Sequence, residues 1–500
     1  MVAPFARSAM KNVINAKPRK RSERLGLPFP KIESPTWTIG NSGPIDLLPL
    51  LAKYDVPAPR YTSYPPATQF TRAFDDARYT GHITRAIGER GETEISLYVH
   101  LPFCDTLCYF CGCTMIVSNN REKIAEYLDY LKREIALARE LIGPDTVVVQ
   151  MHWGGGSPTH LTPTEISKLG LHIRNLFQFS DDAEISIEID PRGLTLDHIQ
   201  AMKSVGFNRA SVGVQDFNEN VQVAVNRVQS RSVTEQAIEW CREAGMTSIN
   251  LDLIYGLPYQ TIEGFRETLD AVRLVSPDRI AVYNFAYVPW VKPHQKLIEI
   301  ETLPSATNKL ALLELAVREL TSGGYEYLGM DHFAKPTDAL VAAQREGTLH
   351  RNFQGYSTLA GKDLLSFGIS AIGRIENTFA QNVKELPDYY RMIDDDRLPI
   401  EKGYELTADD AAREYAIMQL MCNLRVDKRD VERLFGVTFD DYFSASMESM
   451  KALEVDGLCK ISDRSIEVTH MGRYFLRNIA VQFDAYIGHS KGEKLYSRAV

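Results

Sequence analysis

The chain is 500 residues long, which exceeds one ordinary domain, so we expect a large catalytic body and at least one smaller appendage. Its formal net charge of -9 and its pI near 5.8 exclude the overall basic character of most nucleic-acid-binding proteins. The sequence contains neither an apolar run near the roughly 20 residues of a membrane span nor a signal-peptide pattern, so we expect a cytoplasmic protein.

The first part of the chain is basic and proline-interrupted. Residues 1–40 carry eight Lys or Arg but only two Glu, without apolar periodicity. Pro18, Pro28 and Pro30 would break the amphipathic helix of a transit peptide. We predict that residues 1–44 form a basic, disordered extension, residues 45–390 a catalytic domain and residues 391–500 an accessory domain.

From residue 95 onward, short apolar runs alternate with segments of helical periodicity. In one such segment, Ile124 to Ile142, apolar residues recur at spacings of three, four and seven, as on one face of a helix. The apolar runs are residues 95–100, 147–152, 184–190, 209–215, 249–255 and 280–287. Strands buried on both faces and joined by helices form a parallel sheet, so we predict an α/β fold with an open sheet or a partial barrel.

Glycine and polar residues follow or end the first five runs. These residues are the cysteines after residue 100, Gly154 to Thr159, Glu188 to Arg192, Gln215 with Asp216, and Asp252 ahead of Tyr255 and Gly256. Ligands bind at the carboxyl ends of parallel strands, so we expect these residues to share one rim and form an active site. For Asp190 and Asp216, a capping or turn role is an equal alternative.

Four of the seven cysteines lie between residues 104 and 113. Cys104, Cys108 and Cys111 can supply three thiolates to a 4Fe-4S cluster that keeps one iron open for chemistry. A zinc site with all four cysteines is the alternative, but Cys113 is only two residues beyond Cys111 and is hard to fold back onto the same ion. We interpret Cys241, Cys422 and Cys459 as ordinary buried residues.

The three-cysteine loop after a first strand, Phe110 before the third cysteine, and the glycines 154–156 resemble the radical S-adenosylmethionine (SAM) superfamily. Within it, Cys111-Gly112-Cys113 and segments 59–65, 213–217 and 352–356 are similar to the oxygen-independent coproporphyrinogen III oxidases, also called coproporphyrinogen dehydrogenases. The likeness runs from about residue 45 to the C-terminus. It implies a partial (β/α)6 barrel with a smaller, mainly helical C-terminal domain, which fits helices over Ala408–Met421 and Val431–Phe435 and a strand over Ser465–Val468.

The resemblance implies an oxygen-independent oxidative decarboxylation in heme biosynthesis. Two propionate side chains of coproporphyrinogen III would become vinyl groups, giving protoporphyrinogen IX, through a 5'-deoxyadenosyl radical generated from SAM at a 4Fe-4S cluster. A low-potential donor such as flavodoxin or ferredoxin would reduce the cluster. The family suggests a monomer.

The resemblance also implies roles for single residues. Cys104, Cys108 and Cys111 would hold the cluster, and Cys113 would be an essential residue that does not bind iron, as an electron or hydrogen relay. The positions expected to contact a first SAM are Tyr98, Gly155, Glu188 and Ile372. The positions expected to contact a second SAM are Phe110, Gly156, Ser157, Gln215, Arg227, Asp252 and Ala286. Ser157 stands where the family usually has threonine, and Arg227 without the resemblance would be interpreted as a surface charge.

A substrate with four carboxylates requires a locally basic pocket, because unpaired buried carboxylates are costly. The cationic residues in segments that could face the rim are Arg60, Arg209, His332, Lys335, Arg351 and Arg374. Any one of them alone is more often a solvated charge. We expect the stretch from Arg60 to Tyr64 and the C-terminal domain to close the site.

Two related functions remain as alternatives. Heme chaperones keep the three-cysteine loop but usually have Asp-Phe after the third cysteine and a His-Asn-x-x-Tyr-Trp segment. This chain has Gly112-Cys113 and the different segment 350–357 at these places. A related enzyme that methylates and opens heme is the second alternative, because likeness of fold alone does not determine function.

Overall fold

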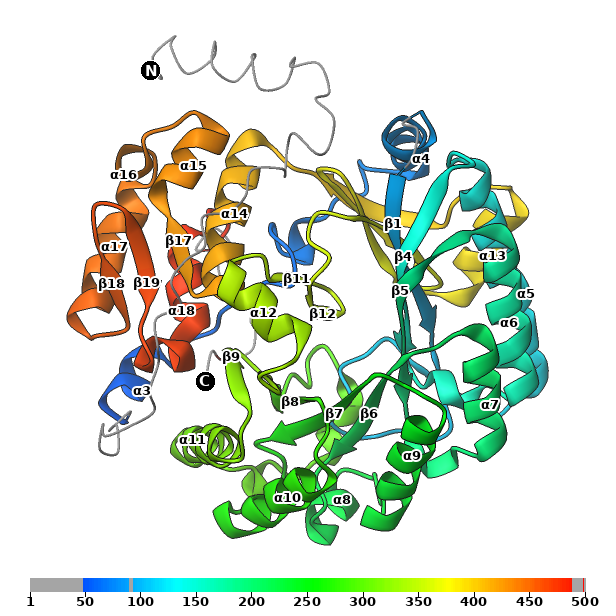
Figure 1. The fold of residues 1–500 in the computed structure, drawn as a ribbon, viewed down its shortest axis with the longest axis horizontal. Coiled ribbons are helices and arrows are strands. Elements are labelled where there is room, and N and C mark those ends of the chain that lie inside the picture. Colours follow the sequence, from blue (N-terminus) through cyan, green and yellow to red (C-terminus); the bar gives the residue numbers. More distant parts are fainter. Residues whose placement is uncertain (1–47, 90–92, 488–497, 499–500) are drawn as a thin grey trace.

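The main body is built on one 12-stranded sheet. The computed structural model describes residues 48–89, 93–487 and 498, so the predicted extension 1–44 lies outside the described residues. Six neighbouring strands of the sheet are parallel and follow one another in chain order (Figure 1). They are β1 (Thr93–Leu101), β4 (Thr146–Gly155), β5 (Gln178–Ile189), β6 (Arg209–Gln215), β7 (Ser248–Tyr255) and β8 (Arg279–Asn284). All six predicted strands are thereby confirmed.

Helices connect these strands and cover the outer, convex face of the sheet (Figure 1). They are α5 (Arg121–Glu140), α6 (Pro163–Leu176), α7 (Leu196–Val205), α8 (Glu219–Ala224), α9 (Arg231–Glu243), α10 (Ile262–Val275) and, after β8, α11 (Ala306–Ser322). Helix α5 begins where the side chain of Asn120 accepts a hydrogen bond from the N–H of Lys123. It buries Ile124, Leu131 and Ile135, as its apolar periodicity predicts.

The prediction that the strands are buried on both faces is wrong for the central strands. In β7, Leu251, Leu253 and Tyr255 are buried under the helices, whereas Asn250 and Asp252 on the other face are partly exposed. Strands β5 and β6 alternate in the same way. The concave inner side of the curved sheet, called the hollow below, therefore presents polar residues.

Further strands extend the parallel region at both sides, and the sheet stays open. Strand β13 (Asp363–Phe367) runs parallel to β1 and is followed by the antiparallel strands β14 (Ile372–Ile375), β15 (Thr378–Asn382) and β16 (Ile400–Glu405). At the other side, β10 (His332–Ala334) and β9 (Glu326–Gly329) are antiparallel. Because β16 and β9 are the two edges, the partial barrel is confirmed.

A short hairpin occupies the hollow between the arms of the sheet (Figure 1). It consists of β11 (His350–Asn352) and β12 (Gly355–Ser357). The Oγ of Ser357 lies 3.5 Å from Nε2 of Gln150 on β4, and the ring of Tyr356 packs edge-on against His332 of β10. The hairpin therefore contacts both sides of the hollow.

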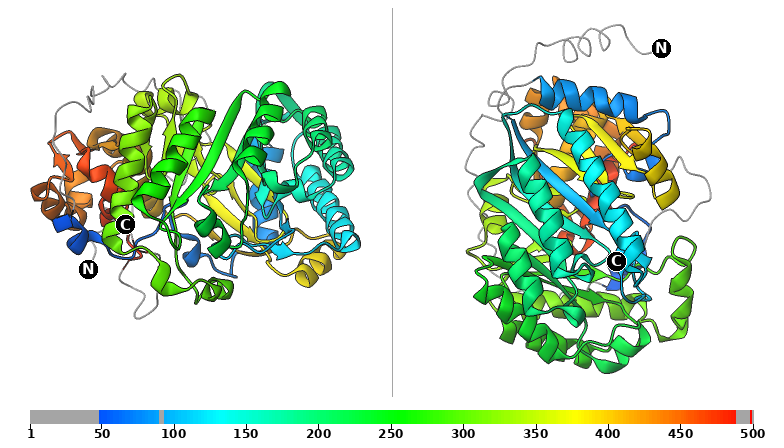
Figure 2. Two further views of the ribbon diagram at one scale, coloured as in Figure 1. Left: turned by 90° about the horizontal axis from the view of Figure 1, so that it is seen from below. Right: turned by 90° about the vertical axis from the view of Figure 1, so that its right-hand side faces the viewer.

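The C-terminal part lies at the end of the molecule opposite α5 and α6 (Figure 2, left). It contains α14 (Ala408–Asn423), α15 (Lys428–Phe435), α16 (Phe439–Tyr442), α17 (Ser444–Val455), α18 (Leu476–Ala480) and a small sheet of β17 (Arg425–Asp427), β18 (Cys459–Ile461) and β19 (Ser465–Val468). The predicted helices and strand of this part are confirmed. Strand β16 belongs to the main sheet although it follows residue 390.

The remaining helices lie around this framework: α3 (Leu48–Tyr54), α4 (Asp76–Ile83), α12 (Ala339–Glu346) and α13 (Leu386–Asp394). Within the described ranges, none of the helices is both long and apolar enough to cross a membrane.

Candidate active site

The cysteine loop follows directly from β1. It connects two short paired strands, β2 (Phe103–Cys104) and β3 (Ile116–Val117), so its ends lie side by side. Two distant segments hold its backbone through hydrogen bonds. From the first segment, the side chain of Asn226 donates to the carbonyl of Leu107, and the carbonyl of Val225 accepts from the N–H of Tyr109. From the second segment, the side chains of Gln295, His294 and Lys292 hydrogen-bond to the carbonyls of Phe110, Cys111 and Cys113, respectively. Tertiary contacts therefore determine the shape of the loop.

The loop thiols differ in their chemical environment. Burial, together with the neighbouring Cys111 and Cys108, raises the pKa of Cys104 to about 12. The side chain of Cys113 hydrogen-bonds to Cys111 and, against the effect of burial, lowers the pKa of Cys111 to about 7. The same contact, followed by burial, raises the pKa of Cys113. Cys111 is therefore the thiol most easily ionised, with Cys113 as its neutral partner.

The donor set fits a 4Fe-4S cluster. Three thiols, Cys104, Cys108 and Cys111, share one loop, and the sulfur of Cys108 accepts hydrogen bonds from Arg192 and Arg227. Hydrogen bonds to sulfur are a recurring feature of such clusters. Over residues 48–89, 93–487 and 498, no three His, Cys, Asp or Glu side chains converge on a point that could hold a single metal ion. Ligands of a cluster bind separate irons and stand further apart.

The glycine segment after β4 packs directly against the start of the cysteine loop. The N–H groups of Gly156 and Ser157 donate to the carbonyls of Leu101 and Phe103, both at 2.9 Å. A Cβ on Gly156 would lie only 2.5 Å from the carbonyl oxygen of Pro102, and Gly155 has a φ of +115°, which L side chains rarely adopt. Glycine is therefore required where these two chain segments meet.

Glu188, next to the end of β5, faces the hollow beside this segment. Oε2 of Glu188 accepts from the N–H of Gly155 at 3.2 Å, and Oε1 lies 3.4 Å from Nε2 of His152. Burial disfavours the carboxylate, but His152 and the Gly155 N–H outweigh it and hold the pKa of Glu188 below its usual value. The ring of His152 stacks on Tyr98, and the Tyr98 hydroxyl contacts His100 at 3.0 Å.

Ile372 lies close to Tyr98 although nearly 300 residues separate them in the chain. Ser366 of β13 pairs with Tyr98 of β1, and its hydroxyl donates to the carbonyl of Ile372 at 2.7 Å. The four positions predicted for a first SAM, namely Tyr98, Gly155, Glu188 and Ile372, are therefore linked through direct contacts of neighbouring strands.

The other predicted positions surround the cysteine loop from the opposite strands. Nε2 of Gln215 and Nη2 of Arg227 lie 2.9 and 3.0 Å from the place a Cβ would take on Gly213. The side chain of Gln295 donates to the carbonyls of both Phe110 and Ala286, so these two residues are neighbours. Burial raises the pKa of Asp252 to about 6, and Ser211 and Asn250 donate to it.

The residues predicted to bind substrate carboxylates lie in different parts of the structure. Arg60 donates to the carbonyl of Asn284, the last residue of β8, and so lies at the carboxyl ends of the strands. The expectation for Arg209 and Lys335 is wrong. Arg209 begins β6 and pairs with Glu184, whereas Lys335 follows Ala334, which pairs with the first residue of β8, so both lie at the opposite, amino ends.

Of the other three residues, Arg351 lies on β11, Arg374 on β14 and His332 on β10. Arg374 forms a bidentate pair with Glu414 at 2.6 and 2.7 Å. Burial, then Arg351, lowers the pKa of His332 to about 3, so this ring is neutral near pH 7. Arg351 is 4% exposed and lies 3.8 Å from Asp331, and its Nε and Nη1 have no hydrogen-bond partner in the described part of the chain.

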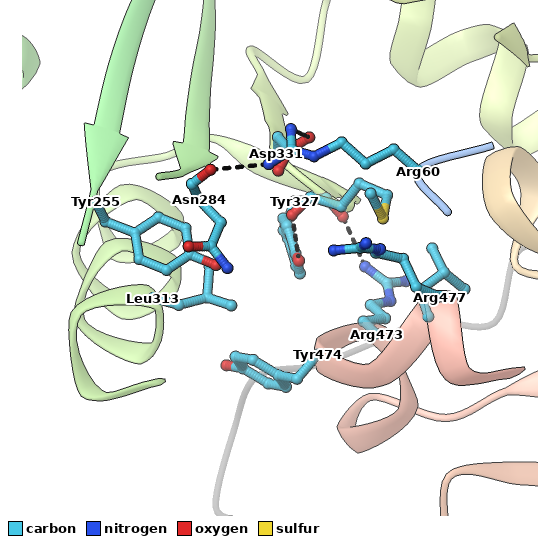
Figure 3. A pocket seen from close by; sticks show the side chains of 11 residues that line it. Arg60, Tyr255, Asn284, Leu313, Tyr327, Asp331, Arg473, Tyr474 and Arg477 are labelled. Carbon is cyan, nitrogen blue, oxygen red and sulfur yellow. Dashed lines mark hydrogen bonds and ion pairs between the residues drawn. The ribbon is translucent and has the colours of Figure 1, made fainter. Parts of the chain in front are cut away.

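A small polar pocket lies outside the hollow, between α11 and the C-terminal part (Figure 3). Tyr255 projects into it from the outward face of β7, and Arg60, Arg473, Arg477 and Asp331 border it. It offers space for about one water molecule. It is too small for a porphyrin-sized molecule, so we place the candidate active site in the hollow.

Some residues of the site carried no usable signal in the sequence. Lys292, His294 and Gln295 lie in a segment without a motif, and only the fold brings them to the cysteine loop. Asp190 caps the turn after β5, as the alternative reading predicts, but it also pairs with Arg227 at 3.0 Å. The carboxylate of Asp216 accepts hydrogen bonds from Asn218, Gln260 and Thr268, so its role is structural.

Comparisons with known proteins agree with this arrangement. Residues 98–272 match the family model of the radical SAM superfamily, and residues 406–475 match that of the HemN C-terminal domain. A relative from Synechocystis sp., named oxygen-independent coproporphyrinogen III oxidase, is 44% identical over 455 residues, which cover 90% of this chain and 97% of that protein. One from Salmonella typhimurium with the same name is 45% identical and covers 91% and 98%.

The fold has a close counterpart among solved structures. The coproporphyrinogen III oxidase HemN from Escherichia coli, described as a radical SAM enzyme, superimposes with a TM-score of 0.82 at 45% sequence identity. The superposition covers 86% of this chain and 98% of that one.

Proposed function

The chain belongs to the family of oxygen-independent coproporphyrinogen III oxidases, and from this premise we propose how its own residues serve the reaction. The protein is a radical SAM oxidoreductase of heme biosynthesis. It decarboxylates two propionate side chains of coproporphyrinogen III to vinyl groups without oxygen, giving protoporphyrinogen IX. The heme-chaperone and heme-degrading alternatives are not favoured, since these relatives match over about nine-tenths of the chain.

The cofactors are a 4Fe-4S cluster and SAM. When bound, they supply one electron that cleaves SAM and the 5'-deoxyadenosyl radical that removes hydrogen from the substrate. Cys104, Cys108 and Cys111 would hold the cluster. Hydrogen bonds from Arg192 and Arg227 to the sulfur of Cys108 support this assignment, because such bonds are a recurring feature of iron–sulfur clusters.

A first SAM molecule would lie between Tyr98, Gly155, Glu188 and Ile372. Glu188 supports this role because its lowered pKa keeps it an acceptor, which suits the hydroxyl and ammonium groups of SAM. Gly155 donates its backbone N–H to Glu188, and a Cβ there would lie 2.6 Å from the ring of His100, so glycine keeps these positions together.

A second SAM molecule would contact Phe110, Gly156, Ser157, Gln215, Arg227, Asp252 and Ala286. The grouping of Gln215 and Arg227 at Gly213, and of Phe110 and Ala286 at Gln295, supports one shared binding surface. Nε of Arg227 has no hydrogen-bond partner among the described residues, although the side chain is buried. A ligand carboxylate would satisfy it.

The substrate would occupy the polar hollow, with the hairpin β11–β12 at one side. Arg351 is the strongest candidate for a propionate partner, because two of its N–H groups are buried without an acceptor in the described part of the chain. Arg60 at the carboxyl ends of the strands is the second candidate. Arg374 is already paired and His332 is neutral, so neither supplies a free charge.

The finer predictions on partners and organisation stay proposals. A flavodoxin or ferredoxin would donate the electron, and the protein would be a cytoplasmic monomer. Residues 45–390 would form the catalytic domain and residues 391–500 the accessory domain. The match of the C-terminal family model from residue 406 onward supports a separate accessory part.

The observation that best supports this function is the loop with three thiols at the rim of an open, parallel barrel with a polar inner side. The test is anaerobic reconstitution with iron and sulfide, followed by SAM, a reductant and coproporphyrinogen III. We expect products that have lost one and then two carboxyl groups, together with 5'-deoxyadenosine. Heme binding without consumption of coproporphyrinogen would contradict the assignment.

A further inference from the structure

Arg192 is held rigidly against the cysteine loop by its neighbour Asp190. Asp190 begins the turn after β5, and its Oδ1 accepts from both the backbone N–H and Nε of Arg192, at 3.1 and 3.0 Å. Oδ2 accepts from Nη2 at 2.6 Å. A guanidinium bound through two N–H groups to one carboxylate has little freedom to turn.

Two guanidinium groups converge on one cluster ligand. Nη2 of Arg192 donates to Sγ of Cys108 at 3.8 Å, and Nη1 of Arg227 donates to the same sulfur at 3.7 Å. Burial opposes the ionisation of Asp190, but Arg227 and Arg192 outweigh it and lower its pKa to about 2. The guanidinium groups of Arg192 and Arg227 and the carboxylate of Asp190 therefore lie beside the sulfur of Cys108, a residue that is 8% exposed.

We propose that Arg192 is a positioning residue that makes the cluster easier to reduce by fixing a positive charge and an N–H donor against the sulfur of Cys108. The proposal rests on the proposed function in one respect, the assignment of the cluster to Cys104, Cys108 and Cys111. When a low-potential donor adds one electron, negative charge on the cluster and its sulfurs increases. A permanent cation at the sulfur stabilises the reduced form more than the oxidised form.

The role of Arg192 differs from that of Arg227. Arg227 also donates to the carbonyl of Gly213 and is proposed to bind the second SAM. Within the described residues, the Arg192 side chain hydrogen-bonds to Asp190 and Cys108 alone. Arg192 therefore keeps its charge at the sulfur whatever Arg227 binds.

The test measures the reduction potential of the reconstituted cluster, without any substrate. Arg192→Gln removes the charge and Arg192→Lys keeps it. We expect Arg192→Gln to bind a full complement of iron and sulfide but to be about tenfold harder to reduce, a shift of about 59 mV to lower potential for one electron. Arg192→Lys should lie between this variant and the wild type. The potentials come from titrations monitored by electron paramagnetic resonance.

Asp190→Asn supplies a change of opposite sign. It removes the negative charge, while its amide oxygen can still accept from the backbone N–H and from Nε of Arg192 and keep the guanidinium in place, so the potential should rise. Opposite shifts cannot come from a general loosening of the loop. Arg279→Gln is the matched control, because Arg279 pairs with Asp338 at 2.8 Å, at the amino end of β8 and away from the cysteine loop. This variant should lower stability and leave the potential unchanged.

Equal potentials of Arg192→Gln and the wild type, with full iron content, would overturn the proposal. If Arg192→Gln loses the cluster, Asp190→Asn decides, and an unchanged or lower potential in that variant overturns it equally. Failure of the proposed function would look different, since wild-type protein would then not assemble a 4Fe-4S cluster or cleave SAM.

Discussion

The cysteine loop shows how neighbouring residues of one type acquire different properties. Cys104 is partly buried near the other two thiols, and Cys111 is hydrogen-bonded to Cys113. Cys113 is exposed, and its contact with Cys111 raises its pKa. A neutral thiol beside a cluster ligand is well suited to pass on an electron or a hydrogen atom, as we propose for Cys113.

Cys113→Ser should retain the cluster and lose product formation by at least about 100-fold, the usual scale for removing a group that acts in the transition state. Iron content, the visible spectrum and product masses measure both properties. Cys111→Ser is the control and should lose the cluster. A Cys113→Ser protein without cluster would show that Cys113 is itself a ligand.

At the level of elements, a buried carboxyl of α5 joins the helix to the loop ahead of β14. Glu134 accepts from the N–H of Gly368 at 2.7 Å, from Asn382 at 2.6 Å and from the hydroxyl of Tyr389 at 2.5 Å. Nearby, Tyr127 of the same helix donates to the carbonyl of His100 and accepts from the N–H of Ile369. Helix α5 thus fixes both the end of β1 and the loop that leads to Ile372.

This network predicts a pH dependence of stability. Burial raises the pKa of Glu134 from 4.5 to about 7, although three donors favour the carboxylate. The folded state therefore holds a proton that the unfolded state releases, so this contribution is complete below pH 4.5 and is lost as the pH rises to 7. Comparing pH 5 with pH 8, the stability advantage of wild type over Glu134→Gln should shrink by about 2 to 3 kcal/mol.

Anaerobic denaturant unfolding of both proteins at the two pH values measures this difference. The variant Asp410→Asn serves as control, since Asp410 is equally buried in the C-terminal part and also accepts several hydrogen bonds. A difference between wild type and Glu134→Gln that stays constant or grows with pH would contradict the argument.

Across the whole molecule, the segment from residue 57 to 65 joins the barrel to the C-terminal part. Arg477 of α18 donates to the carbonyls of Ala58, Pro59 and Arg498, and it borders the small pocket (Figure 3). Tyr61 donates to Asp484, while Arg60 of the same segment donates to β8. The position of this segment therefore depends on contacts with α18 and with Asp484.

Arg477→Ala should release this segment and reduce the stability of the protein by about 3 kcal/mol, because the carbonyls of the buried Ala58 and Pro59 and of the exposed Arg498 lose a charged donor. Limited proteolysis should then cut within residues 55–65, and substrate affinity should fall while cluster content persists. Arg433→Ala is a suitable control, since Arg433 forms only an exposed pair with Asp430. Unchanged proteolysis of Arg477→Ala would show that other contacts hold the segment.

The amino-acid sequence was enough to predict the six parallel strands and the helices between them, and its cysteine loop predicts an iron–sulfur cluster. These properties are local: apolar periodicity specifies α5, and the spacing of Cys104, Cys108 and Cys111 predicts a ligand set. The C-terminal strand Ser465–Val468 follows from the same kind of pattern. The apolar composition of the strands was a weaker guide to their burial. In β5, β6 and β7, buried residues alternate with partly exposed residues that face the inner side of the sheet.

Tertiary structure alone decided which distant side chains meet. Arg192 reaches Cys108 from the turn after β5 and Arg227 from the segment after α8, and His294 reaches Cys111 across 183 positions. Tertiary structure also places Arg209 and Lys335 near the amino ends of the parallel strands, opposite to the cysteine loop. The physical reason is that periodicity shows whether a side chain points inward, whereas long-range packing and strand register determine what it meets there.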